Sequence, residues 1–476
     1  MSNSLESTYF SISGEIPSLL HMCRIALLQN PYFRKDLNEY YEPYFKDHWE
    51  NYVSKNPYEI NQMVLYYSAF PQVRETFSFF QLFKFIENFE IAYLAKSKEK
   101  EVEPFVPLNG DEPYEDKHLG FFEPKPEVLE TPLINVWKEY STFVLEPFTK
   151  LEKDTINKVH FVDEPFRPKS DSCFYHSIND KQQFLKQFHL FTNNQFQKFT
   201  SWNNMVIIGG AIVASAMPVP PRYSNDIQKY YNEISHPDSD IDIYIYGLDE
   251  TGFKKKLKEI YAYLQSIHPK VIVVSTPFTV TLCTQYPNRH IQIVIGKWKS
   301  IAEVLLEPDI DCTCIAFDGK NLWTTQRARL SYNWRVINCS PRAYRLRQFP
   351  EYESRLIKYS RRGFYLIDKL LDWKNISTEY LTTGKVRLLE HKVVRGRSYI
   401  NGLRLILCGY KYPEVFKQVD IFKPPTWKKT GLVYGPKWNI YSIIHQLEQP
   451  IMESSHYGPY EVENPFKHVS GIDQVE

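Results

Sequence analysis

The stretch between Ser201 and Leu248 constrains the fold of this chain more than any other. It begins with a short apolar run, Met205 to Ile208, which is typical of a strand. The run stops at two adjacent glycines and passes into small residues, Ala211 to Met217, suited to one or two helical turns. A second strand is predicted from Ile241 to Tyr246. A strand, a glycine turn, a short helix and another strand indicate an α/β unit.

Two carboxylates stand at the start of the second strand. Side chains two apart in a strand point to the same face, so Asp240 and Asp242 should lie side by side while Ile241 and Ile243 face a core. Two oxygen ligands so close together suit Mg²⁺, which takes one or two protein carboxylates, several waters and substrate phosphates. The spacing therefore predicts a site for Mg²⁺ or Mn²⁺.

The glycine turn supplies the other half of a phosphate-handling site. Glycine lets a phosphate approach the backbone, and exposed N–H groups at a helix start attract anions. We assign phosphate binding to Gly209 and Gly210, with the Ser239 hydroxyl beside them. Metal carboxylates that face such a turn can move a nucleotidyl or phosphoryl group.

The pattern of an apolar strand, Gly-Gly and then Ser-Asp-Ile-Asp-Ile resembles the DNA-polymerase-β-type nucleotidyltransferase superfamily. That superfamily includes poly(A) polymerases, CCA-adding enzymes and oligoadenylate or cyclic-dinucleotide synthases. The resemblance implies that Asp240 and Asp242 bind the metals and that Gly209 and Gly210 hold a nucleoside triphosphate. A longer likeness, from about Val206 to Phe364, is similar to uncharacterised nucleotidyltransferase-like regions of fungal and amoebal proteins and implies no particular reaction.

The chain departs from the superfamily pattern in two ways. Between Gly210 and Asp240 lie 29 residues, including a Pro- and Tyr-rich insert from Pro218 to Pro237, where about ten are usual. The third carboxylate is also missing, because the later segment RHIQIVI carries Gln292 where an acid might be expected. Asp309 and Asp311, again two apart, could substitute, and we take Asp311 as the candidate third catalytic acid.

Charge and composition limit the possible partners. The formal net charge of +1 gives no global reason to expect nucleic acid, but Asn321 to Leu405 holds 18 Lys and Arg against 6 Asp and Glu. Aromatic residues interleave with these cations, a pattern that favours triphosphate or RNA contact, although a basic surface paired with an acidic linker would look the same. The candidate contact residues are Arg345, Arg355, Lys358, Arg361 and Arg362.

Cysteine spacing and hydropathy indicate the cellular setting. The seven cysteines form no metal-binding or disulfide pattern, and Cys312 and Cys314 are predicted within an apolar strand, Cys312 to Phe317. We expect reduced thiols, no signal peptide, no membrane helix and a soluble protein of the cytoplasm or nucleus.

We expect an α/β (α+β) chain with a mixed-sheet nucleotidyltransferase core flanked by helical regions. The predicted parts are a helical region (1–95), an acidic Pro-rich linker (96–130), a connecting region (131–180), the core (181–330) and a basic C-terminal region (331–476).

The predicted activity is transfer of a nucleotidyl group from an NTP, with ATP favoured, to a hydroxyl acceptor, foremost an RNA 3′ end. Two alternatives stay open. One is an inactive module of the same fold that binds nucleic acid or a protein, and the other is nucleotidylation of a host molecule. The sequence leaves the oligomeric state open.

Overall fold

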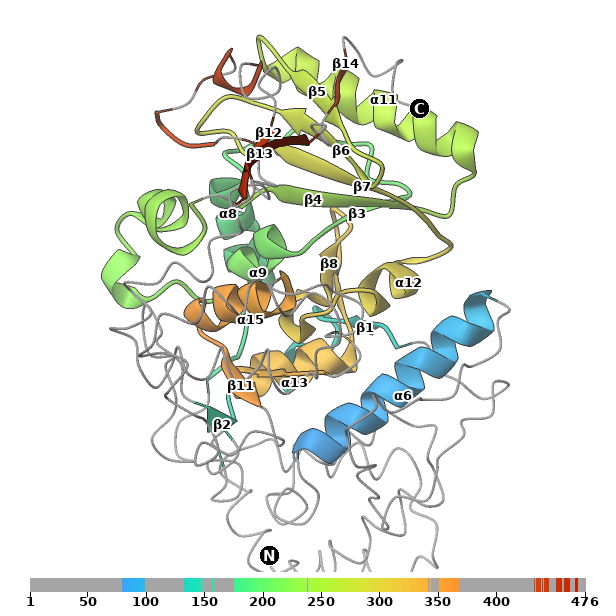
Figure 1. The fold of residues 1–476 in the computed structure, drawn as a ribbon. Helices are drawn as coiled ribbons and strands as arrows, with labels where there is room; N and C mark the ends of the chain where they lie inside the picture. The colour runs from blue at the N-terminus through green and yellow to red at the C-terminus, as the bar shows by residue number, and fades with distance from the viewer. Residues whose placement is uncertain are drawn as a thin grey trace, which may run out of the picture.

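A nine-stranded mixed sheet forms the centre of the molecule (Figure 1). The computed structural model describes residues 79–98, 132–146, 148, 156–157, 175–237, 239–340, 343, 351–367 and parts of 432–469. The strand order is β1-β9-β8-β3-β4-β7-β6-β5-β14. The strands are β1 (Ile134–Asn135), β9 (Leu322–Thr324), β8 (Ile315–Phe317), β3 (Met205–Ile208), β4 (Ile241–Tyr246), β7 (Ile291–Trp298), β6 (Thr279–Cys283), β5 (Ile272–Ser275) and β14 (Lys467–Val469).

Within this sheet, β4 and β7 pair in parallel and every other neighbouring pair is antiparallel. The parallel pair requires a crossover, which α11 (Glu250–Ile267) and the β5–β6 hairpin provide. Tyr286-Pro287 and Asp318-Gly319 lie in the turns before β7 and between β8 and β9. The mixed α/β architecture expected from the sequence is confirmed.

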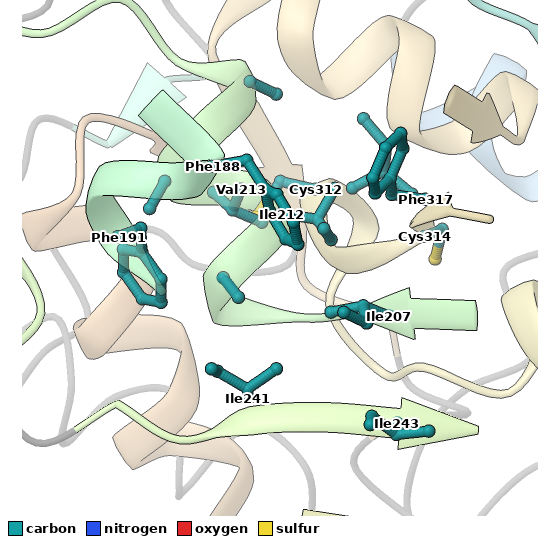
Figure 2. Packing of buried hydrophobic residues seen from close by; sticks show 14 of the residues in the cluster. Phe188, Phe191, Ile207, Ile212, Val213, Ile241, Ile243, Cys312, Cys314 and Phe317 are labelled. Atoms are coloured by element: carbon teal, nitrogen blue, oxygen red, sulfur yellow. The ribbon is translucent and has the colours of Figure 1, made fainter. Parts of the chain in front are cut away.

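Three helices cover one face of the sheet: α8 (Lys181–Phe191), α9 (Gly210–Ala216) and α11. The alternation in β4 points Ile241 and Ile243 toward them, fully buried. Figure 2 shows Phe188 and Phe191 of α8 with Ile212 and Val213 of α9 above these isoleucines. Burial of large apolar side chains at roughly 25 cal/mol per Å² makes this layer the main stabilising contact of the core.

The opposite face is covered by α12 (Ile301–Leu306). Val304 and Leu305 of this helix pack with Val206 and Ile208 of β3. α6 (Phe79–Lys98) contacts α12 and α13 (Gln326–Trp334), whereas η5 (Asp311–Thr313) contacts α9 and α13. Tyr352, Leu356 and Tyr359 of α15 (Glu351–Arg361) pack in the same cluster as α8 and α9. A smaller sheet of β10 (Val336–Asn338), β11 (Tyr365–Ile367) and β2 (Ile156–Asn157) follows, and β12 (Ile451–Ser455) pairs with β13 (Gly458–Val462).

The insert between α9 and β4 folds into three short turns. They are η3 (Pro221–Tyr223), α10 (Ile227–Lys229) and the π-helical η4 (Tyr230–Ser235). The buried Tyr231 anchors them, since its hydroxyl donates to Gln187 Oε1 at 2.9 Å and to the Ala214 carbonyl at 3.0 Å. The extra residues are therefore packed onto α8 and α9.

One local prediction was wrong. Cys312 and Cys314 do not lie in a strand, because Cys312 is in η5, Cys314 ends it, and β8 begins only at Ile315. Both side chains are buried thiols, as are those of Cys283 and Cys339. The linker 99–130, Arg345 and the basic residues after 367 lie outside the described residues. No helix in the described part of the chain is both long and apolar enough to cross a membrane.

Candidate active site

The glycine turn contacts the carboxylate strand directly. Gly209 has φ of 72°, a left-handed conformation that glycine adopts without strain. A Cβ on Gly209 would stand 2.7 Å from Asp242 Oδ2, and a Cβ on Gly210 would stand 2.5 Å from Ser239 Oγ. No other residue type fits this turn without moving those side chains. The predicted phosphate-binding and metal-binding halves therefore form one site.

The register of the sheet fixes the carboxylates. Asp242 stands opposite Ile208 at the end of β3 and opposite Gln292 in β7. Asp240 directly precedes β4. Burial raises the pKa of the Cys283 thiol, and the negative charge of the nearby Asp240 adds to that shift. The side-chain alternation predicted for this strand is thus present, with Gln292 beside Asp242 at the position considered for a third acid.

The electrostatics around Asp242 are mixed. Burial raises the pKa of this carboxyl above its ordinary value, and Lys358 and Arg355 of α15 oppose the shift. A carboxyl that is costly to ionise gains from a divalent cation nearby. Asp240 and Asp242 offer Mg²⁺ two oxygen ligands from one face, which fits a site completed by substrate phosphates and water.

The helix α15 brings basic side chains to the glycine turn. Arg362, just after the helix, has Nη1 3.4 Å from where a Cβ of Gly210 would lie. Burial lowers the pKa of His236, at the end of the insert, and the positive charges of Arg362 and Lys358 lower it further. Lys358 and Arg361 are both exposed to solvent, and Lys358 also acts on the pKa of Asp242. Of the predicted contact residues, Arg355, Lys358 and Arg362 therefore lie around the site.

The second Asp-x-Asp pair is bound to arginines. Asp309 Oδ1 accepts from Arg355 Nε at 3.0 Å and lies 2.9 Å from Arg355 Nη2. Asp311 binds Arg327 Nη1 at 3.4 Å and the Asn338 N–H at 2.6 Å. Within the described ranges, no group of three or more His, Cys, Asp or Glu side chains could hold a metal ion. We therefore leave Asp311 out of the metal ligands considered below.

Two neighbours of the site could not be foreseen. The hydroxyl of Tyr434, from the C-terminal segment, donates to the Pro287 carbonyl at 3.1 Å. Burial raises the pKa of Tyr434 to about 12; Tyr286 and Asp240 add to this shift, and Arg289 opposes it. Arg289, just before β7, is fully buried beneath the loop that carries Ser239. The only sequence signal for Arg289 was its place in the segment TQYPNRHIQI.

Comparisons with known proteins cover this same region. Residues 180–335 match the model of the Gabija anti-defense 2 (Gad2) family, a span that contains the glycine turn and both aspartates but not α15. Over 299 residues the chain is 23% identical to the uncharacterised protein R883 of Acanthamoeba polyphaga mimivirus, covering 59% of this chain and 61% of that protein. The chain thus spans about three fifths of this viral relative. No solved structure matches.

Proposed function

We propose that this chain is a metal-dependent nucleotidyltransferase with a polymerase-β-type core. The observation that carries the proposal is the close approach of the glycine turn to the acid strand. A Cβ on Gly209 would lie 2.7 Å from Asp242 Oδ2, and a Cβ on Gly210 would lie 2.5 Å from Ser239 Oγ. A phosphate on the glycine backbone would then lie beside a metal held by the aspartates. Such juxtaposition is what phosphoryl and nucleotidyl transfer require.

Each residue has a role in this proposal. Asp240 and Asp242 would hold Mg²⁺ or Mn²⁺, which when bound neutralises phosphate charge and lowers the pKa of a nearby hydroxyl. Gly209, Gly210 and Ser239 would bind the phosphates through N–H groups and a hydroxyl. Lys358 and Arg362, which lie near the turn, would neutralise the phosphate charge that remains.

The proposed reaction joins an acceptor hydroxyl to the α-phosphorus of an NTP, with ATP favoured. The hydroxyl oxygen loses its proton to solvent and forms the new ester bond, while the bond to the β-phosphate breaks and pyrophosphate leaves. An RNA 3′ end is the first acceptor to test, because cations of α15 adjoin the site and would meet a polynucleotide that approaches it.

A specific observation favours a second candidate, an inactive module of the same fold. Gln292 stands next to Asp242 in the sheet, and Asp309 and Asp311 are bound to arginines. The matched family is described as anti-defense against Gabija. A role of that kind would be compatible with binding alone, or with nucleotidylation of a defence component in place of RNA.

The test is incorporation of label from each NTP by the purified full chain, with Mg²⁺ or Mn²⁺ and an oligoribonucleotide or protein acceptor. We expect incorporation by the native chain and loss of at least about a thousandfold in an Asp240→Ala, Asp242→Ala variant. Glu250→Ala is the matched control, since it removes an exposed acid that pairs with Lys254 in the same domain. Absence of incorporation, with NTP binding unchanged in the double variant, would favour the inactive module.

A further inference from the structure

Arg289 is a buried cation beside the site, and every donor of its guanidinium is bonded. Its side chain is fully buried, and its five N–H donors meet five neutral oxygen atoms. Nε donates to the Phe191 carbonyl at 3.0 Å, while Nη2 donates to the Tyr231 carbonyl at 3.2 Å and to Asn232 Oδ1 at 2.9 Å. Nη1 donates to the carbonyls of His236 and Ser239, both at 2.8 Å.

The position of Arg289 is itself fixed. Its N–H donates to Gln195 Oε1 at 3.1 Å, and its carbonyl accepts from Gln195 Nε2 at 3.1 Å and from Thr284 Oγ1 at 2.9 Å. The guanidinium carbon lies 4.1 Å from the centre of the Phe191 ring. Because backbone and side chain are both held, the guanidinium is a rigid reference point for what binds to it.

The groups it binds lead directly into the acid strand. The carbonyls of His236 and Ser239 flank the turn that precedes Asp240. On the other side of Asp240, the N–H of Ile241 donates to the His290 carbonyl at 2.9 Å. Arg289 and its neighbour thus hold the chain on both sides of Asp240, while Ser239 Oγ faces the Gly210 backbone.

Only arginine can fill this place. Its flat guanidinium presents five donors in fixed directions, whereas the lysine ammonium has three donors around a point charge. A shorter or neutral side chain would leave buried carbonyls without partners, and each such loss destabilises the local structure.

We infer that Arg289 is a positioning residue that sets Ser239 and Asp240 against the glycine turn and joins the insert 218–237 to them. The inference rests on the proposed function for its effect on ligand binding. Arg289 touches neither metal nor nucleotide in this scheme and acts through the loop from His236 to Ser239. Residues that orient metal ligands in this way change metal affinity by about 10- to 100-fold when replaced.

The experiment compares Arg289→Lys with Arg329→Lys in the full chain. Arg329 is a matched control because it is 1% exposed in the same domain, but its Nη1 binds Glu139 at 3.2 Å. Two readouts are measured at equal fraction folded. One is hydrogen–deuterium exchange of peptides that cover 236–241, and the other is the Kd for Mn²⁺ with a non-hydrolysable ATP analogue.

We expect Arg289→Lys to speed exchange in 236–241 by about tenfold and to weaken Mn²⁺–nucleotide binding by about 10- to 100-fold, with Arg329→Lys close to native in both. Unchanged exchange in Arg289→Lys, or equal changes in both variants, would overturn the inference. If Arg289→Lys does not fold, Gln195→Leu, which removes both Gln195 hydrogen bonds to the Arg289 backbone, must produce the same two changes for the inference to stand.

The two readouts separate this inference from the proposed function. If the native chain binds no Mn²⁺–nucleotide, the proposed function fails, but faster exchange in 236–241 still supports positioning by Arg289. If the native chain binds and the Arg289→Lys loop exchanges normally, the proposed function stands and the positioning role is rejected.

Discussion

Two pairs of aspartates in this chain share the same spacing but not the same surroundings. Asp240 and Asp242 open a strand, where side chains two apart point to one face, and they lie beside the glycine turn. Asp309 and Asp311 lead into the 3₁₀ turn η5, and each pairs with a different arginine, Arg355 or Arg327. The element that follows an Asp-x-Asp sequence therefore decides whether its carboxylates can share a ligand.

The largest expected difference in transfer rate comes from replacing one aspartate of each pair by asparagine. Asp242→Asn should lower nucleotidyl transfer by about a thousandfold, equal to roughly 4 kcal/mol, because the amide is a poor ligand for the metal. Asp311→Asn should leave transfer within about threefold, since its partners are Arg327 and the Asn338 N–H. Initial rates at saturating Mg²⁺ measure both. Equal losses in the two variants would mean that the pairs act together.

The strands around the first pair were predictable because apolar runs and glycines mark them locally. Met205–Ile208 and Ile241–Tyr246 were predicted with the bounds that the structure has. The short helix differed slightly, since α9 already includes Gly210 and ends at Ala216. Hydrophobic periodicity and turn residues act over a few residues, so they can be recognised directly in the sequence.

The contacts that complete the site were not predictable in the same way. Arg289 binds carbonyls between 50 and 98 residues away in the chain, and Tyr434 bonds to a carbonyl 147 residues away. Asp311 and Asp242 both end an Asp-x-Asp sequence, and the binding of Asp311 by Arg327 of α13 and by the Asn338 N–H of β10 depends on tertiary packing. Tertiary packing of this kind leaves no local signature in a single sequence.

The glycine turn belongs to the first pair alone, and it provides the second test. Gly209→Ala should reduce transfer by about a hundredfold, because a Cβ would meet Asp242 Oδ2 at 2.7 Å and φ of 72° is strained for alanine. Gly252→Ala is the control, since Gly252 lies in α11 without a positive φ. Rates and melting temperatures are compared together. A native rate in Gly209→Ala would mean that the glycine turn is not part of the active site.

The third test uses pH and the second pair. Burial raises the pKa of Asp311 from its ordinary 3.8 to about 7, with Glu90 and Glu87 of α6 adding to the shift and Arg327 and the Asn338 N–H opposing it. Between about pH 4 and pH 7 the folded chain then holds a proton that the unfolded chain has lost. Stability from this group is therefore present at low pH and is lost as the pH rises through that window.

Asp311→Asn should remove that dependence. We expect the difference in unfolding free energy between the native chain and the variant to fall with pH by at most about 1.4 kcal/mol per unit between pH 5 and 7, and to level off above pH 7. Urea unfolding of both proteins across this range measures it. Asp242, with its own raised pKa, contributes to both proteins and cancels in the difference. A difference that does not vary with pH would contradict the assignment.

The smallest expected effect asks whether the first pair lacks a third acid. Gln292 adjoins Asp242 in β7, so Gln292→Glu would add a carboxylate on the same face of the sheet. We expect it to tighten Mn²⁺ binding about fivefold, close to 1 kcal/mol, because ligand charge raises affinity for hard cations. Gln326→Glu, in α13, is the control that adds a charge at another glutamine, which is buried. Weaker binding in Gln292→Glu would mean that repulsion from Asp242 dominates and that the metal, if bound, lies away from β7.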